Sequence, residues 1–157
     1  MAQKGIQRGG MKSGGAAQGQ SSGPRAKIKF WEDKGAKKID PLLFSQKAEE
    51  MAKDLAKENQ RQNKLNKRTQ LRKFYDEVLR LDDLAQGKGM VWDAVIPQIH
   101  MLVAKTAYAN GRELVSDAFL QFMKDSVAQV ESPEDLRVFA NFFEAFMGFY
   151  RLYGPRN

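Results

Sequence analysis

The last predicted helix, residues 133–153, limits the possible folds most, because it is apolar around most of its circumference. One stripe at helical spacing contains Leu136, Phe139, Ala140, Phe143, Met147 and Tyr150, and a second contains Val138, Phe142, Phe146, Phe149 and Tyr153. A helix of this kind must be covered on most sides. Either it is the central helix of a bundle, or one stripe contacts another protein chain, and the sequence leaves both interpretations open.

Start signals predict where other helices begin. Ser132 and Pro133, followed by two carboxylates, form the strongest signal, because a cap residue, a first-turn proline and early acidic groups all favour a helix N-terminus. Asp40 and Pro41 form a similar start, and Thr69 is a candidate cap for a further helix.

Apolar residues recur at helical spacing between these signals, and no period-two strand pattern appears. The first helix continues in polar form through residues 57–68, and residues 82–90 form a loop. Pro97 opens a third helix, since proline suits a first turn and disfavours helix in the residue before it. A fourth helix contains residues 115–127. We therefore expect an all-α fold, a compact bundle of about five helices formed by residues 39–157.

The segment before this domain has a different composition. Residues 1–26 are mainly Gly, Gln, Ser and Ala with scattered basic residues, and they bury too little apolar surface to offset the entropy of ordering. Phe30 and Trp31 follow in a lysine-rich stretch that either docks on the domain or continues the tail. We interpret residues 1–38 as a flexible, disordered, basic Gly-rich tail.

The formal charge of +7 is unevenly distributed along the chain. Residues 1–38 contain nine Lys and Arg against two Asp and Glu, residues 39–73 contain nine against five, and residues 74–157 contain eight against twelve. A basic half joined to an acidic half predicts one side that faces a polyanion and another that contacts protein.

Residues that could carry catalysis are scarce. The chain has no cysteine, which excludes disulfides, thiolate nucleophiles and cysteine-ligated zinc, and which fits a reducing cytoplasm. The only histidine, His100, has no nucleophile motif nearby, and Asp82 with Asp83 is more simply a polar helix end than a cation site. No apolar run reaches the ~20 residues of a membrane span. We expect a soluble, cytoplasmic, non-catalytic protein without metal or other cofactor.

Two groups of residues are candidates for binding a polyanion. Lys57, Arg61, Lys64 and Arg68 are spaced by four, three and four residues, so on one continuous helix they would form a stripe about 16 Å long. Such a stripe contacts several phosphates or, alternatively, is an ordinary solvated helix face.

The second group is Lys105, Tyr108 and Arg112, which share one helix face and its end. Two cations around an aromatic ring can hold a phosphate and stack on a base or ribose. The alternative is a tyrosine packed inside the bundle with two cations at its rim.

Three segments resemble a known family, the small helical subunit of type III-A CRISPR (Csm) effector complexes. They are TQLRKFYDEVL at 69–79, IPQIHMLVAKTAYANGR at 96–112 and FANFFEAFMGFYRLYG at 139–154, and they follow the family's order. The resemblance covers roughly residues 40–154 and leaves residues 1–38 outside it.

The resemblance implies a non-catalytic subunit that stacks in several copies as the inner filament of a ribonucleoprotein complex in antiviral defence. Its partners would be the CRISPR guide RNA and target RNA, the backbone and large subunits, and copies of itself. Binding to target RNA, or to the guide–target duplex, would be sequence-independent and made through the backbone.

The resemblance and the charge pattern together give one set of RNA-binding candidates. Arg61 and Arg68 come from the charge pattern alone. The full set is Arg61, Arg68, Thr69, Gln70, Arg72, Lys73, Lys105, Tyr108 and Arg112.

Other functions stay open from the sequence. The chain is alternatively a helical protein-interaction scaffold that uses its C-terminal aromatic helix, or a general nucleic-acid-coating protein. An enzyme would need an unrecognised carboxylate–metal site at Asp82 and Asp83. Membrane-surface binding is disfavoured, because residues 57–70 have almost no apolar face to insert.

Overall fold

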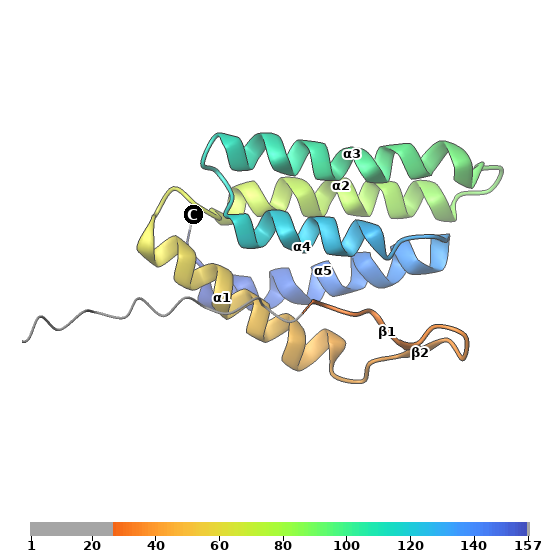
Figure 1. Cartoon of the computed structure of the whole chain (residues 1–157), viewed down its shortest axis with the longest axis horizontal. Helices are drawn as coiled ribbons and strands as arrows, with labels where there is room; N and C mark the ends of the chain where they lie inside the picture. The colour runs from red at the N-terminus through yellow and green to blue at the C-terminus, as the bar shows by residue number, and fades with distance from the viewer. Residues whose placement is uncertain (1–26, 157) are drawn as a thin grey trace, which may run out of the picture.

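The structure, a computed structural model, describes residues 27–156. Its five α-helices confirm the predicted all-α bundle (Figure 1). They are α1 (Ala48–Arg61), α2 (Arg68–Gln86), α3 (Trp92–Gly111), α4 (Asp117–Ala128) and α5 (Pro133–Tyr153). A short antiparallel hairpin, β1 (Trp31–Asp33) and β2 (Lys38–Ile39), and a π-helical turn, η1 (Leu43–Lys47), precede them. The sequence pattern did not predict this hairpin.

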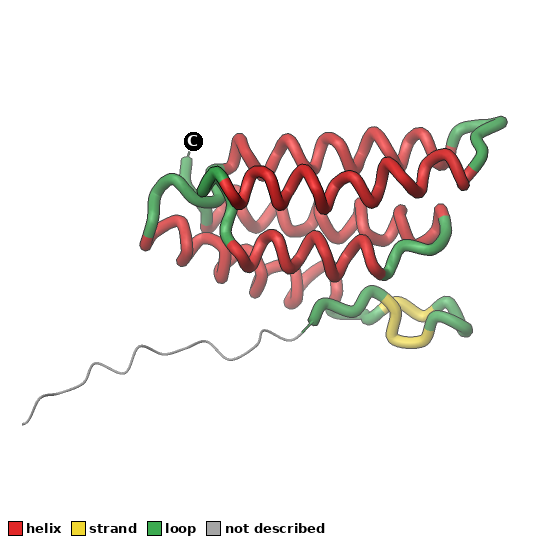
Figure 2. Tube along the Cα trace, turned by 45° about the horizontal axis from the view of Figure 1, so that its top comes forward, coloured by secondary structure: helices red, strands yellow, loops and turns green. Residues whose placement is uncertain are grey.

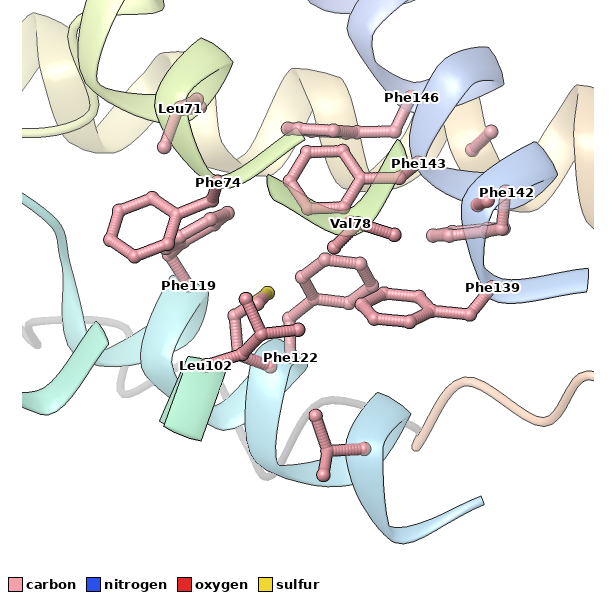
Figure 3. Close-up of a cluster of buried hydrophobic side chains, with 14 of the residues drawn as sticks. Leu71, Phe74, Val78, Leu102, Phe119, Phe122, Phe139, Phe142, Phe143 and Phe146 are labelled. Carbon is pink, nitrogen blue, oxygen red and sulfur yellow. The ribbon is translucent and has the colours of Figure 1, made fainter. Parts of the chain in front are cut away.

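Helix α5 is the central helix of the bundle. It packs against α1, α2 and η1, and Phe139, Phe142, Phe143 and Phe146 are all fully buried. Figure 3 shows these rings meeting side chains of α2 and α4 in one cluster. Since residues from both apolar stripes lie in the core, the structure decides between the two interpretations of this helix. This packing does not support the alternative of a scaffold that binds other proteins through an exposed aromatic face of α5.

The start of α5 follows the sequence signal. The Ser132 side chain accepts a hydrogen bond from the Asp135 backbone N–H, and the Asp135 carboxylate accepts one from the Ser132 N–H at 3.1 Å. Pro133 occupies the first helical turn. This reciprocal capping box satisfies backbone donors that a helix N-terminus otherwise leaves unpaired.

The predicted continuous helix through residues 57–68 is wrong. Helix α1 ends at Arg61, and a turn of residues 62–67 leads into α2. Asn66 adopts a left-handed conformation with φ 54°, which a helix cannot contain, and the buried Asn59 side chain donates to the Leu65 carbonyl at 2.6 Å. Helix α2 starts at Arg68, so Thr69 is not its cap.

Two further helix boundaries differ from the sequence prediction. Helix α2 continues to Gln86, through part of the expected loop. Helix α3 begins at Trp92 and contains Pro97 inside it. The upstream start buries Val95 in the core, although Pro97 has no backbone N–H to donate to the preceding turn.

Residues 27–39, here called the N-terminal strap, pack on the bundle at the corner between α4 and α5. The Phe30 ring is fully buried and stacks on Phe139 with a centroid distance of 5.9 Å. Its backbone N–H donates to the Gln129 side chain at 2.9 Å. Figure 2 shows the two strands of the strap outside the group of helices, near one end of the bundle. The expected tail therefore does not extend through residue 38, and residues 1–26 lie outside the described part of the chain.

Polar contacts also hold the strap to the beginning of α5. The Trp31 indole N–H donates to the buried Asp135 carboxylate at 2.8 Å, and the Lys34 ammonium lies 3.1 Å from it. Burial alone would raise the pKa of Asp135. Hydrogen bonds from the Glu131 backbone N–H, Lys34 and Trp31 outweigh burial and hold this pKa below its usual range.

The Phe30→Ala variant should lose about 3 to 5 kcal/mol of unfolding free energy, because it leaves a cavity beside Phe139. Urea unfolding followed by circular dichroism measures this loss. Phe44→Ala is the matched control, since Phe44 is partly exposed, and it should cost about 1 kcal/mol or less. Equal stability of Phe30→Ala and the wild type would contradict the packing of the strap.

The Asp135→Asn variant should be about 2 kcal/mol less stable than the wild type at pH 7, because a neutral amide accepts these hydrogen bonds less well. The folded pKa of Asp135 is lowered, so the stability it contributes is present above its unfolded pKa and is lost as the pH falls through the folded value. The difference in unfolding free energy between the variant and the wild type, measured by urea unfolding, should therefore become smaller below pH ~4. A difference that stays constant down to pH ~2 would contradict an ionised Asp135.

Candidate nucleic-acid interface

Helices α2 and α3 form an open hollow of about 380 Å³, here called the α2–α3 groove. Its lining residues come from neighbouring turns of the two helices and the segment that follows α3. They are Gln70, Lys73, Phe74, Glu77, Lys105, Tyr108, Ala109, Arg112 and Leu114.

Five of the nine predicted binding residues line this groove: Gln70, Lys73, Lys105, Tyr108 and Arg112. They come from two separate segments of the sequence. Within each helix they are three or four residues apart and therefore share a face. Packing of α2 against α3 brings the two faces together.

The Tyr108 ring is the main exposed aromatic surface of the groove. Its side chain is 68% exposed, and the Arg112 guanidinium lies 5.6 Å from the ring centroid. This distance is within the range of a cation–π interaction. The alternative of a tyrosine packed inside the bundle is wrong, because the core side of α3 here is formed by Ala109.

Glu77 adds one carboxylate to the groove. It pairs with Arg80 at 2.8 Å and with Lys105 at 3.4 Å. The Arg80 guanidinium, with Lys105 as a lesser contributor, holds the pKa of the Glu77 carboxyl below its usual range, so Glu77 is ionised at neutral pH. Within residues 27–156, no ion pair engages Lys73 or Arg112. The groove therefore has three cations, Lys73, Lys105 and Arg112, and one carboxylate, Glu77, which is already paired. This balance makes the groove electropositive.

Thr69 and Arg72 lie on α2 but outside the groove lining. Both are exposed, and Arg72 faces Asp76 one turn further along the helix at 3.4 Å. Exposed pairs of this kind contribute little stability, so the Arg72 side chain can exchange partners at low cost.

Arg61 and Arg68 lie at the two sides of the turn that separates α1 from α2. The Arg68 guanidinium donates to the backbone carbonyl of Arg156. In Figure 1 this turn and the α3–α4 connection lie at the same end of the bundle. An ion pair between Lys64 of the turn and Glu113 of the α3–α4 connection, 3.8 Å apart, joins these two segments. The predicted straight stripe is therefore a cluster around the end of the bundle, next to the groove.

The sequence prediction missed Glu77, Phe74, Ala109 and Leu114. Glu77 lies seven residues after Gln70 and four after Lys73, so helical periodicity alone could have placed it on the same face. Phe74 and Ala109 are buried core residues whose edges reach the groove, and no polar pattern marks them.

The carboxylate–metal alternative at Asp82 and Asp83 lacks support. The Asp82 carboxylate is buried and pairs with Arg137 at 2.9 Å. In the described part of the chain, no cluster of three or more acidic or histidine residues is arranged to hold a metal ion. None of the described helices is long and apolar enough to cross a membrane.

Comparison with known proteins identifies a matching family. The family model described as Csm2 Type III-A matches residues 42–156, which are most of the chain. No curated protein and no solved structure matches it.

Proposed function

The chain belongs to the Csm2 family of type III-A CRISPR systems, and from this premise we propose that its α2–α3 groove binds the RNA backbone. Family membership makes the protein a small subunit of the Csm effector complex, in a family of structural, non-catalytic subunits. The proposed ligand is target RNA, alone or paired with the guide. Several copies would stack as the inner filament, in contact with the backbone and large subunits, in the cytoplasm.

The observation that carries this proposal is the convergence of two sequence segments on one exposed electropositive groove. Lys73 comes from one segment, and Lys105, Tyr108 and Arg112 come from the other. Cations around an exposed aromatic ring supply contacts to phosphate oxygens and a flat face for a ribose or base.

These contacts suit a subunit that must accept any RNA sequence. Lysine and arginine bind phosphate oxygens, which are the same in every nucleotide, so they position RNA without reading it. Base pairing with the guide reads the sequence, as in other RNA-guided complexes. Glu77 disfavours a phosphate directly beside it, and its pairing with Arg80 and Lys105 limits this repulsion.

The groove also shares its end of the bundle with the turn of residues 62–67. Arg61 and Lys64 are exposed there, and Arg68 begins α2. We assign these cations to the same ligand, as contacts that extend the binding surface beyond the groove. The chain needs no cofactor for this function.

The triple variant Lys73→Ala, Lys105→Ala, Arg112→Ala should bind a fluorescent single-stranded RNA of about 20 nucleotides much more weakly at low salt. Each lost phosphate contact lowers the slope of log affinity against log salt concentration by about 0.7, so the slope should fall by about 2. Fluorescence anisotropy across a salt series measures both quantities, and wild-type affinity should not depend on RNA sequence.

The matched control is Lys29→Ala, Lys88→Ala, Lys124→Ala, which removes the same charge from exposed positions on the strap, the α2–α3 loop and α4. It should change affinity and slope much less. Equal losses in the two triple variants would show that net charge, and not the groove, binds RNA. Wild-type affinity that stays flat with salt would rule out phosphate binding.

A further inference from the structure

Asn66 joins two loops that are far apart in the sequence. Its backbone N–H donates to the Leu114 carbonyl at 3.0 Å. Its side-chain oxygen accepts from the Ser116 N–H at 2.9 Å, and its side-chain nitrogen donates to the Ser116 hydroxyl, also at 2.9 Å. Three hydrogen bonds therefore link the α1–α2 turn to the connection between α3 and α4.

The same residue is anchored to two further helices. Its backbone carbonyl accepts a hydrogen bond from the Tyr150 hydroxyl on α5. Its side-chain amide nitrogen lies 3.5 Å from the Leu55 backbone carbonyl on α1. Asn66 is fully buried, so each of these polar groups needs a partner, and the structure provides one for each. Its φ of 54° suits asparagine better than most other residues.

The two loops joined by Asn66 both carry cations of the proposed RNA surface. The turn contains Lys64 and leads into Arg68, and the α3–α4 connection begins at Arg112 of the groove. Among residues 27–156, Lys64 and Glu113 form the ion pair between these loops, but both side chains are 67% exposed. An ion pair this exposed is too weak to hold the two loops in fixed positions relative to each other. The buried hydrogen bonds of Asn66 can do so.

We propose that Asn66 is a positioning residue for RNA binding, an inference that rests on the proposed function. It holds the cations of the turn at a fixed distance from those of the groove, so that one RNA strand contacts both sets together. Without this link the turn must be ordered when RNA binds, and ordering lowers affinity. Asn66 is buried and touches no ligand itself.

The test compares Asn66→Gly with Tyr150→Phe in the full chain. Glycine keeps the positive φ but removes every side-chain hydrogen bond of Asn66, including the two to Ser116. Tyr150→Phe removes one buried hydrogen bond to the same turn and leaves the Ser116 link intact, so it is the control for a loss of stability that does not break this link. Both variants are assayed with the RNA and salt series used for the groove, at a temperature where circular dichroism shows them folded.

Asn66→Gly should bind RNA about tenfold more weakly at low salt, with a salt slope lower by about 0.7 to 1.4, equivalent to one or two phosphates. Tyr150→Phe should lower the melting temperature but keep the wild-type slope. An unchanged slope in Asn66→Gly, or equal slope losses in both variants, would overturn the positioning role. In either case, the proposed function still holds if the wild type binds RNA and the groove triple variant does not. Wild-type protein without salt-dependent binding would overturn both proposals.

Discussion

Burial of α5 on most of its sides is the constraint on which the other elements depend. Its two aromatic stripes point in different directions, so a single neighbouring helix cannot cover both. Helices α1 and α2 pack against it directly, and Phe122 of α4 meets four of its rings. Phe30 of the strap fills the place beside Phe139 and Phe142 that these helices leave open. The strap is thus part of the core although it lies outside the region that the family model matches.

The same packing places the groove. Phe74 of α2 contacts Phe119 of α4 inside the core, which fixes the rotation of α2 about its axis. Lys73 and Glu77 then face α3 across the surface of the molecule, while Arg72 points elsewhere. The electropositive groove is therefore a consequence of core packing, and its geometry needs no ion pairs to maintain it. A surface that is preorganised in this way binds its ligand without an additional ordering cost.

The sequence determined the all-α class, the number of helices, the capped start of α5 and the candidates in the groove. These features depend on local periodicity, capping chemistry and spacing within single helices, which are all visible in consecutive residues. Lys105, Tyr108 and Arg112 share a face because of helical geometry alone. Their assignment to one site with Gln70 and Lys73 came from the family resemblance, since spacing within one helix says nothing about its neighbour.

Tertiary structure decided the features that depend on distant partners. The turn at 62–67 interrupts a stretch made mainly of good helix formers because Asn66 finds buried hydrogen-bond partners at Leu114, Ser116 and Tyr150. The strap is ordered because Phe30 enters a space between side chains about a hundred residues away. Helix propensity is worth less than about 1 kcal/mol for each ordinary residue, whereas a buried ring or a satisfied buried amide contributes more. Contacts of that size override local preference, and they exist only once the whole chain is folded.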